Sequence, residues 1–308
     1  MVKKNNKVLM RWGGCLQRLK KVGKVLGYSL GGVCVLLLLT QAFLLRGTPG
    51  TTIDPAAGPR TVRYSKVPTL LIPGWGGNTI TYNHLIKYYQ NHNVAQKVMT
   101  VWVSPHQHIR VSGDWHGQKN ALIQVLFDWN YNASYHPQVG QLRQVLIYLN
   151  KHYGINRTNI VAHSYGGTEF MHAYMGSKYL QRTLRLNKLV LLGVPVEESL
   201  SDHLPYHYPL IHDSKDKNFH QLRAQMKEWQ LNYPVEIYNL MGSKEGSKLT
   251  DGAVPHIQSE MLRALIQSHP TIEYHQKIYH NTTHSQLHDR PLILNKIEQI
   301  LWGKESRQ

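Results

Sequence analysis

One serine in this sequence has neighbours that suit a nucleophile. Ser164 lies in the stretch NIVAHSYGGTEF (residues 159–170), where an apolar run ends and a helical pattern begins. A nucleophilic serine on a sharp strand-to-helix turn needs small residues two positions before and two positions after it, so that the chain can fold back closely. Ala162 and Gly166 hold these two positions. We therefore predict that Ser164 is a nucleophile rather than a turn serine with no role.

A serine hydroxyl is a weak nucleophile until a base takes its proton, and an acid must orient that base. After a turn of this kind the order along the chain is Ser, then Asp or Glu, then His. Asp251 follows the apolar run VEIYNLMG in a turn, and His280, His284 and His288 follow the last apolar run. We predict Asp251 as the acid; the other interpretation is an ordinary Asp-Gly turn.

An acyl-transfer site also needs backbone donors for the oxyanion that forms on the substrate. The residue after the nucleophile, Tyr165, supplies one N–H group. The glycine-rich loop IPGWGGN (72–78) follows the first apolar run and lets the backbone approach closely. We predict that Trp75 in this loop supplies the second N–H group; the alternative is a plain glycine turn.

Strands and helices alternate along the chain after residue 60. Apolar residues at helical spacing in 138–154 and 256–268 predict helices between six apolar runs that predict buried strands. This alternation is typical of a mostly parallel sheet with helices on both faces. The expected strands are VPTLLIP (67–73), VMTVWV (98–103), NIVAHS (159–164), KLVLLGVP (188–195), VEIYNLMG (235–242) and IEYHQKIY (272–279).

A long connection, residues 196–234, joins the fourth and fifth of these strands. It contains the amphipathic stretch NFHQLRAQMKEWQLN, which predicts a helix. Connections of this length usually carry function. We expect a lid insert that covers the nucleophile and forms an acyl pocket; the alternative is a peripheral packing helix.

These pieces together resemble the α/β-hydrolase cell-surface proteins of lactobacilli and other Gram-positive bacteria, a lipase-like group of unassigned function. The resemblance rests on PGWGGN, VAHSYGG, TDGAVP and HSQLHDRP, in this order. It implies an α/β-hydrolase domain over residues 61–308. Members of the group more often have His-Gly where this chain has Pro73-Gly74, and Gly where it has Ala162.

The late histidines are then separated by their surroundings. His280 directly follows the strand expected at 272–279, too close to the sheet edge to reach the serine. In hydrolases of this fold the catalytic histidine commonly precedes the last helix, here expected from about Pro291, and a small polar residue and a leucine follow it. HSQL at 284–287 fits this pattern and HDRP at 288–291 does not. We predict His284 as the base, with His288 as the alternative.

The N-terminal part of the chain has a different composition. Residues 1–24 carry eight Lys and Arg and no acid, and residues 25–45 are apolar and uncharged. A helix over 25–45 reaches about 30 Å, the thickness of a bilayer core, and the basic flank places residues 1–24 in the cytoplasm. We expect an uncleaved transmembrane signal anchor rather than a cleaved signal peptide. The Pro- and Gly-rich residues 46–60 are expected to form a linker.

The charge and composition of the chain limit the classes of partner that it is expected to bind. Of 35 Lys and Arg, 27 lie beyond residue 24 together with all 18 acids, which leaves a net charge of +9. An anionic lipid or an anionic wall polymer is one expected partner of such an exported domain, and a solvated basic surface with no partner is the alternative. No nucleic-acid motif accompanies the charge. In the histidine-rich segment 203–212, the close spacing of His203, His207 and His212 suggests a metal site. No His-Glu-x-x-His helix and no cysteine partner accompanies it, so we expect a surface loop, and neither metal nor cofactor.

The sequence thus predicts a membrane-anchored extracytoplasmic serine hydrolase, with one transmembrane pass and an extracellular catalytic domain. Its expected substrate is a small-molecule or lipid carboxylic ester, cleaved through an acyl-enzyme. One alternative is an acyltransferase that uses the same three residues. The other is a catalytically silent cell-surface module that binds glycan through its basic face.

Overall fold

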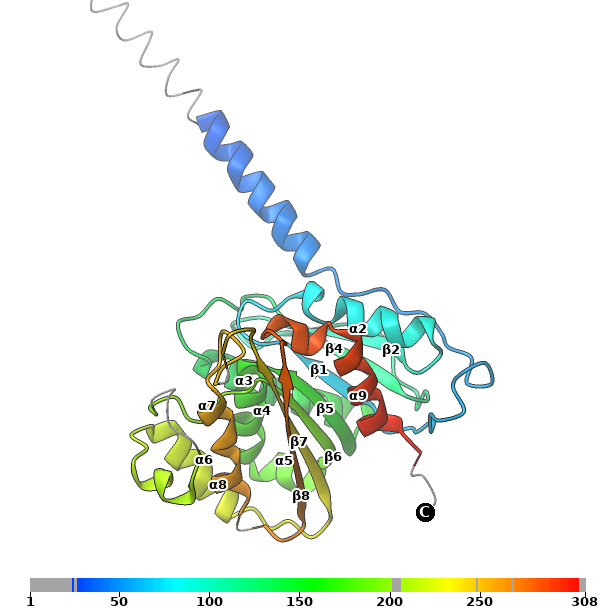
Figure 1. Cartoon of the computed structure of the whole chain (residues 1–308). Coiled ribbons are helices and arrows are strands. Elements are labelled where there is room, and N and C mark those ends of the chain that lie inside the picture. Colours follow the sequence, from blue (N-terminus) through cyan, green and yellow to red (C-terminus); the bar gives the residue numbers. More distant parts are fainter. Residues whose placement is uncertain (1–23, 25–26, 201–205, 248, 268, 305–308) are drawn as a thin grey trace, which may run out of the picture. The chain divides into compact units, whose positions relative to one another are not determined.

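The computed structural model of the chain describes residues 24, 27–200, 206–247, 249–267 and 269–304 (Figure 1). The chain divides into two compact units, Met1–Arg46 and Gly47–Gln308. In the first unit, residues 27–44 form a helix that length and composition make able to cross a membrane, with a mean hydropathy of 1.7. An apolar helix near the N-terminus also fits a signal sequence. The predicted basic segment 1–24 lies outside the described residues except for Lys24.

The second unit is built on one eight-stranded sheet with the order β3-β2-β4-β1-β5-β6-β7-β8. All neighbouring strands are parallel except β2 and β3, which are antiparallel. The predicted mostly parallel sheet is therefore confirmed. The strands are β1 Thr69–Ile72, β2 Gln96–Val103, β3 Ile109–Gly113, β4 Ala121–Phe127, β5 Arg157–His163, β6 Arg185–Leu192, β7 Val235–Ser243 and β8 Ile272–His280.

Helices cover both faces of this sheet (Figure 1). One apolar cluster lies on each face of the sheet. Helices α2 and α9 contribute to one cluster, and α3, α4, α6 and α8 contribute to the other. Strand β1 shows the alternation behind this arrangement, since Leu71 faces the first cluster while Leu70 and Ile72 face the second. The α-helices are α2 Thr79–Asn91, α3 His136–Tyr153, α4 Tyr165–Met175, α5 Lys178–Thr183, α6 Lys217–Lys227, α7 His256–Glu260, α8 Leu262–Ile266 and α9 Pro291–Trp302, with short 3₁₀ helices η1 Tyr208–His212 and η2 Ser285–His288.

All six predicted strands are present, but two further strands were missed. Strand β4 lies between β2 and β1 and is buried throughout. Its run ALIQVLF contains Gln124, whose side chain accepts from the Thr48 N–H group at 2.8 Å. A buried glutamine inside a strand breaks the apolar pattern, and only the partner that satisfies it makes the position possible. The helix predicted at 256–268 is divided at Met261 into α7 and α8.

The first residues of the segment 46–60, which the sequence predicts to be a linker, pack on the folded unit. Residues from Gly47 onward belong to the folded unit, and Thr48 and Ile53 are buried. The N–H groups of Gly47 and Thr51 donate to Thr79 Oγ1 at 3.1 Å and to Gln90 Oε1 at 2.9 Å. Gly and Pro in this segment therefore indicate an irregular chain packed on the domain, which we call the entry segment (residues 47–54).

The long connection 196–234 contains helix α6, as predicted. Its apolar face, formed by Phe219, Leu222 and Met226, is buried together with Trp229, and α6 packs against α4 and α8. The start of the connection is fixed by the buried Glu197, which accepts hydrogen bonds from Ser199, Leu200 and Ser214. Helix α6 is therefore a packed helix, and a lid role for this connection stays a prediction.

Candidate active site

Ser164 lies on the turn between β5 and α4, as predicted. Its backbone has φ 53° and ψ −137°, a conformation that L-residues rarely adopt. The turn is held on both sides, because the Ser164 N–H group donates to Leu192 O at 3.0 Å and the Ser164 carbonyl accepts from Gly167 at 3.0 Å. Strain of this kind at a partly exposed serine is typical of functional sites.

Gly166, one of the two small residues of the turn, is required by close backbone contacts. A Cβ atom at Gly166 would lie 2.5 Å from Pro73 O and 2.8 Å from Ile72 O, so the turn packs directly on the end of β1. A Cβ atom at Gly74 would lie 2.6 Å from Ser164 Cβ and 3.3 Å from Ser164 Oγ. Ala162 is fully buried within β5. The glycine-rich loop after β1 therefore lies against the serine.

Asp251 and His284 form a buried acid–base pair. The distance between Asp251 Oδ2 and His284 Nδ1 is 2.7 Å, and the two side chains are 2% and 17% exposed. The other carboxylate oxygen, Oδ1, accepts from the N–H groups of Ala253 and Val254 at 2.9 and 2.8 Å. The backbone N–H group of His284 also donates to the backbone carbonyl of Asp251 at 3.0 Å. Both the side chain and the backbone of His284 are thus fixed by Asp251, and the ring faces the carboxylate with Nδ1.

Gly193 lies beneath this pair, directly after β6. It has φ +57°, and a Cβ atom there would come to 2.7 Å from Asp251 Oδ2, 2.9 Å from Leu287 Cδ1 and 3.0 Å from His284 Nδ1. Only glycine leaves room for these groups in this backbone conformation. Sequence reasoning missed this residue, although the Gly after the run KLVLL was its signal.

Two further histidines surround His284. The His163 ring lies 4.3 Å from the His284 ring, and its Nε2 is 3.1 Å from the His284 carbonyl oxygen. Burial lowers the pKa of His163 far below its usual value, and it lowers the pKa of His288 to about 4. Both rings are therefore neutral near pH 7. His288 packs against His163 and Tyr82 and makes no ion pair with a carboxylate within the described part of the chain.

The structure thus separates the three late histidines. His280 is the exposed last residue of the edge strand β8, and His288 is packed among rings. His284 alone of the three is paired with Asp251. Within the described residues, Ser164 Oγ and His284 share no hydrogen bond. Such contacts often form only when substrate is bound.

Two backbone N–H groups next to residues of the turn have no acceptor in the part of the chain that the structure describes: Tyr165 follows Ser164 in the chain, and Trp75 follows Gly74, which lies against Ser164. Among the hydrogen bonds of the described residues, the N–H groups of Trp75 and Tyr165 donate none. Tyr165 is the first residue of α4, a position whose N–H group has no acceptor within the helix. Buried Asn130 holds the Trp75 loop, since its Nδ2 donates to Gly74 O at 2.7 Å and its carbonyl accepts from Gly76. Nothing in the sequence pattern had marked Asn130.

The side chain of Tyr165 connects the site to the long connection. Its hydroxyl donates to Glu198 Oε1 at 2.7 Å. Burial raises the pKa of Glu198, and burial together with this hydrogen bond raises the pKa of Tyr165. The first residues of the connection 196–234 therefore contact the candidate oxyanion residue directly.

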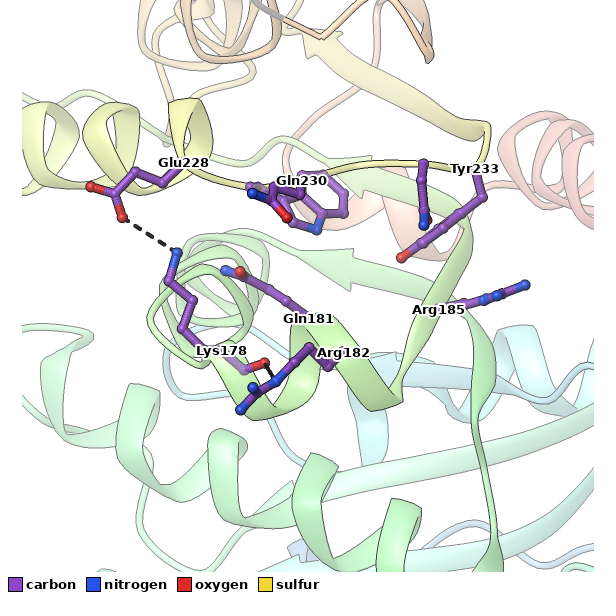
Figure 2. A pocket seen from close by; sticks show the side chains of 9 residues that line it. Lys178, Gln181, Arg182, Arg185, Glu228, Gln230 and Tyr233 are labelled. Carbon is purple, nitrogen blue, oxygen red and sulfur yellow. Dashed lines mark hydrogen bonds and ion pairs between the residues drawn. The ribbon is translucent and has the colours of Figure 1, made fainter.

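A surface hollow of about 510 Å³ lies away from this site (Figure 2). Its lining includes Lys178, Arg182, Arg185 and Glu228, and Lys178 Nζ is 3.3 Å from Glu228 Oε2. Arg185 is the first residue of β6, whereas Ser164 follows the last residue of the parallel strand β5. The hollow is therefore at the opposite edge of the sheet and takes no part in the site.

Comparison with known proteins gives the family. Residues 58–304 match the family described as "Alpha/beta hydrolase of unknown function (DUF915)", and the chain belongs to this family. This confirms the predicted fold and the resemblance to lipase-like cell-surface hydrolases. No curated protein is significantly similar in sequence.

Two solved structures share the fold. A Listeria innocua protein, the product of gene lin2722, has 21% identity and a TM-score of 0.65, over 79% of this chain and 96% of that one. A protein described as a cell surface hydrolase from Lactobacillus plantarum has 18% identity and a TM-score of 0.59, over 76% and 89% of the two chains. At these identities the likeness shows the α/β-hydrolase fold, and the chemistry must be argued from this chain's own residues.

Proposed function

We propose that this protein is a membrane-anchored extracytoplasmic serine hydrolase that cleaves carboxylic esters through an acyl-enzyme. The observation that carries the proposal is the buried Asp251–His284 pair, 2.7 Å apart, in a fold whose strained turn presents Ser164. An acid, a base and a serine in this chain order form a nucleophilic triad in many hydrolases.

The residues would divide the reaction as follows. His284 Nε2 takes the proton of Ser164 Oγ while Oγ attacks the ester carbonyl carbon, and Asp251 stays ionised beside the imidazolium. The N–H groups of Trp75 and Tyr165 stabilise the oxyanion. The C–O bond to the alcohol breaks, and His284 gives its proton to the leaving alkoxide.

Deacylation repeats these steps with water. His284 accepts a proton from water as the water oxygen attacks the acyl carbon, and the proton then returns to Ser164 Oγ when the acid leaves. An alcohol in place of water would make the protein an acyltransferase. Neither half-reaction needs a metal or a cofactor.

A fluorophosphonate probe tests the serine mechanism. We expect the full-length protein in detergent to be labelled, and Ser164→Ala to abolish labelling while the circular dichroism spectrum is unchanged. Ser112→Ala, on the exposed edge strand β3, is the matched control and should label like the parent. A folded parent that resists labelling would instead favour the silent binding module. Adding short alcohols to p-nitrophenyl ester reactions separates hydrolysis from acyl transfer.

The connection 196–234 is proposed to form one wall of the acyl pocket through its first residues. The contact between Glu198 and Tyr165 supports this, whereas packed helix α6 is proposed to act only as a support. Glu198→Gln should change the preference among p-nitrophenyl esters of increasing chain length. Glu228→Gln, on the exposed surface beyond α6, should leave it unchanged. An equal profile in both variants would refute the assignment.

The net positive charge of the folded domain supports an anionic wall polymer as a partner outside the cell. Exposed basic residues stand at the amino ends of the parallel strands, away from the candidate site. They are Lys66, Lys119, Arg157 and Arg185. Salt-sensitive binding to a polyphosphate polymer would support this partner, and salt-insensitive binding would contradict it.

A further inference from the structure

The exposed large apolar side chains of the folded unit share one edge of the sheet. Within the described residues, each follows the carboxyl end of one of the mutually parallel strands β1, β4, β7 and β8, in a loop or a first helical turn. This is the edge at which Ser164 lies. These residues are Trp75, Ile80, Trp129, Tyr131, Leu249 and Leu292.

Four of them, Trp75, Ile80, Trp129 and Tyr131, form what we call the apolar rim. The Tyr131 ring makes edge-to-face contacts with Trp75 and Trp129, at centroid distances of 5.9 and 5.4 Å. Trp75 is 58% exposed, Ile80 61% and Trp129 51%. Single exposed apolar residues are common on soluble proteins, but a cluster of this kind marks an interaction site. Trp and Tyr are also the side chains enriched at membrane–water interfaces.

The chain enters the folded domain at this same rim. The Gly47 N–H group donates to Thr79 Oγ1 at 3.1 Å, and Thr79 directly precedes Ile80. From there the entry segment runs toward the start of β2, where a Cβ atom at Gly50 would meet Lys97 O. Gly47, the first residue of the folded unit, therefore lies beside the rim.

The rim offers almost no charge for an anionic partner. Segments 73–80 and 128–135 contain one charged residue, Asp128, and its Oδ1 accepts from Arg110 at 2.6 Å. The rim therefore suits an apolar or zwitterionic surface rather than a polyanion.

We infer that the apolar rim docks on the lipid surface of the membrane that carries the protein's own anchor, and that the site takes ester lipid directly from this bilayer. The inference rests on the proposed function, in which the helix before Arg46 spans the membrane. Docking buries Trp75, Ile80, Trp129 and Tyr131 at the interface and brings Ser164 to the level of the lipid esters.

Quenching by brominated lipid tests the docking without any assay of activity. The full-length protein with Trp12→Phe is placed in nanodiscs of phosphatidylcholine, with or without bromine on the acyl chains. We expect tryptophan fluorescence to be quenched by brominated lipid, and Trp129→Phe to remove a large part of that quenching. Trp115→Phe is the matched control, because Trp115 follows β3 at the opposite edge of the sheet. This variant should be quenched as strongly as the parent. Equal quenching in both variants, or none in the parent, would overturn the inference.

Salt separates an apolar contact from an electrostatic one. Quenching should be the same in 50 mM and 500 mM NaCl, because the rim has no free cation among the described residues. Quenching that disappears at high salt would place the contact on the basic residues and overturn docking through the rim.

Substrate choice gives the second readout. Ile80→Ser combined with Trp129→Ser should leave turnover of a soluble short-chain ester within twofold of the parent. It should lower turnover of a vesicle-bound ester lipid about tenfold or more, because two interfacial apolar side chains are lost. Equal loss on both substrates, or none on the lipid, would count against docking. A parent that turns over neither ester would count against the hydrolase, and the quenching would still decide the docking.

Discussion

Replacing Gly193 by alanine tests the packing beneath the acid–base pair. The added methyl group would lie 2.7 Å from Asp251 Oδ2, closer than carbon approaches oxygen, and 3.0 Å from His284 Nδ1, tighter than most carbon contacts. The backbone there also has φ +57°, so an L-residue is strained whatever the space. Both effects act on the same contact, the one that orients the proposed base.

The expected magnitudes follow from these two effects. A left-handed backbone costs a non-glycine residue roughly 1–2 kcal/mol, and overpacking a tight site costs about 1–3 kcal/mol more. A shift of about 1 Å in a catalytic group can cost about a hundredfold in rate, and loss of the carboxylate's orienting role about 10⁴-fold. We therefore expect Gly193→Ala to lower the free energy of unfolding by about 2–5 kcal/mol and kcat/KM by about 10² to 10⁴.

Gly154→Ala is the matched control. Gly154 has φ +63° at the end of α3, yet a Cβ atom there would meet nothing within 4 Å. This variant carries the same backbone strain without the clash, so it should lose only about 1–2 kcal/mol and keep its activity. Urea unfolding and p-nitrophenyl ester turnover measure the two quantities. Folded Gly193→Ala protein with activity within about threefold of the parent would refute the placement of the pair.

Three other predictions follow from the site and the chain. His284→Ala should lower ester turnover by several orders of magnitude and His288→Ala only modestly, and the reverse pattern would transfer the role of base to His288. Burial lowers the pKa of His163, His172 and His288, the last two to about 4, so the unfolded chain binds more protons between about pH 6.5 and 4. The free energy of unfolding should therefore fall as pH falls through this window, by up to about 1.4 kcal/mol per pH unit and histidine; urea curves that coincide at pH 6.5 and 4.5 would contradict it. Detergent should be needed to extract the protein, with an N-terminus before Val25, and a soluble form that begins at Phe43 would establish a cleaved signal peptide.

The local pattern of apolar residues in the sequence was sufficient to predict most of the fold. Most of the parallel strands are buried apolar runs, and helices such as α3 and α9 repeat apolar residues at helical spacing, so both can be predicted from the sequence. Strand β4 was not predicted because Gln124 interrupts its apolar pattern. The side chain of Gln124 accepts a hydrogen bond from Thr48, which lies 76 residues earlier in the chain. The same contact packs Thr48 on the domain, and composition cannot show that a Pro- and Gly-rich segment is packed.

The sequence by itself determined which residues could do chemistry. Ser164, Asp251 and His284 stand in a recognisable order, because each follows a strand of the same parallel sheet and the carboxyl ends of such strands meet at one edge. Only the tertiary structure decided which histidine meets the aspartate and which groups hold them. Gly193 under the pair and Asn130 behind the Trp75 loop come from other strand ends, and no local pattern records a contact made across the sheet. The position at which the chain enters the domain was decided in the same way, because it depends on hydrogen bonds to distant residues, such as those from Gly47 to Thr79 and from Thr48 to Gln124.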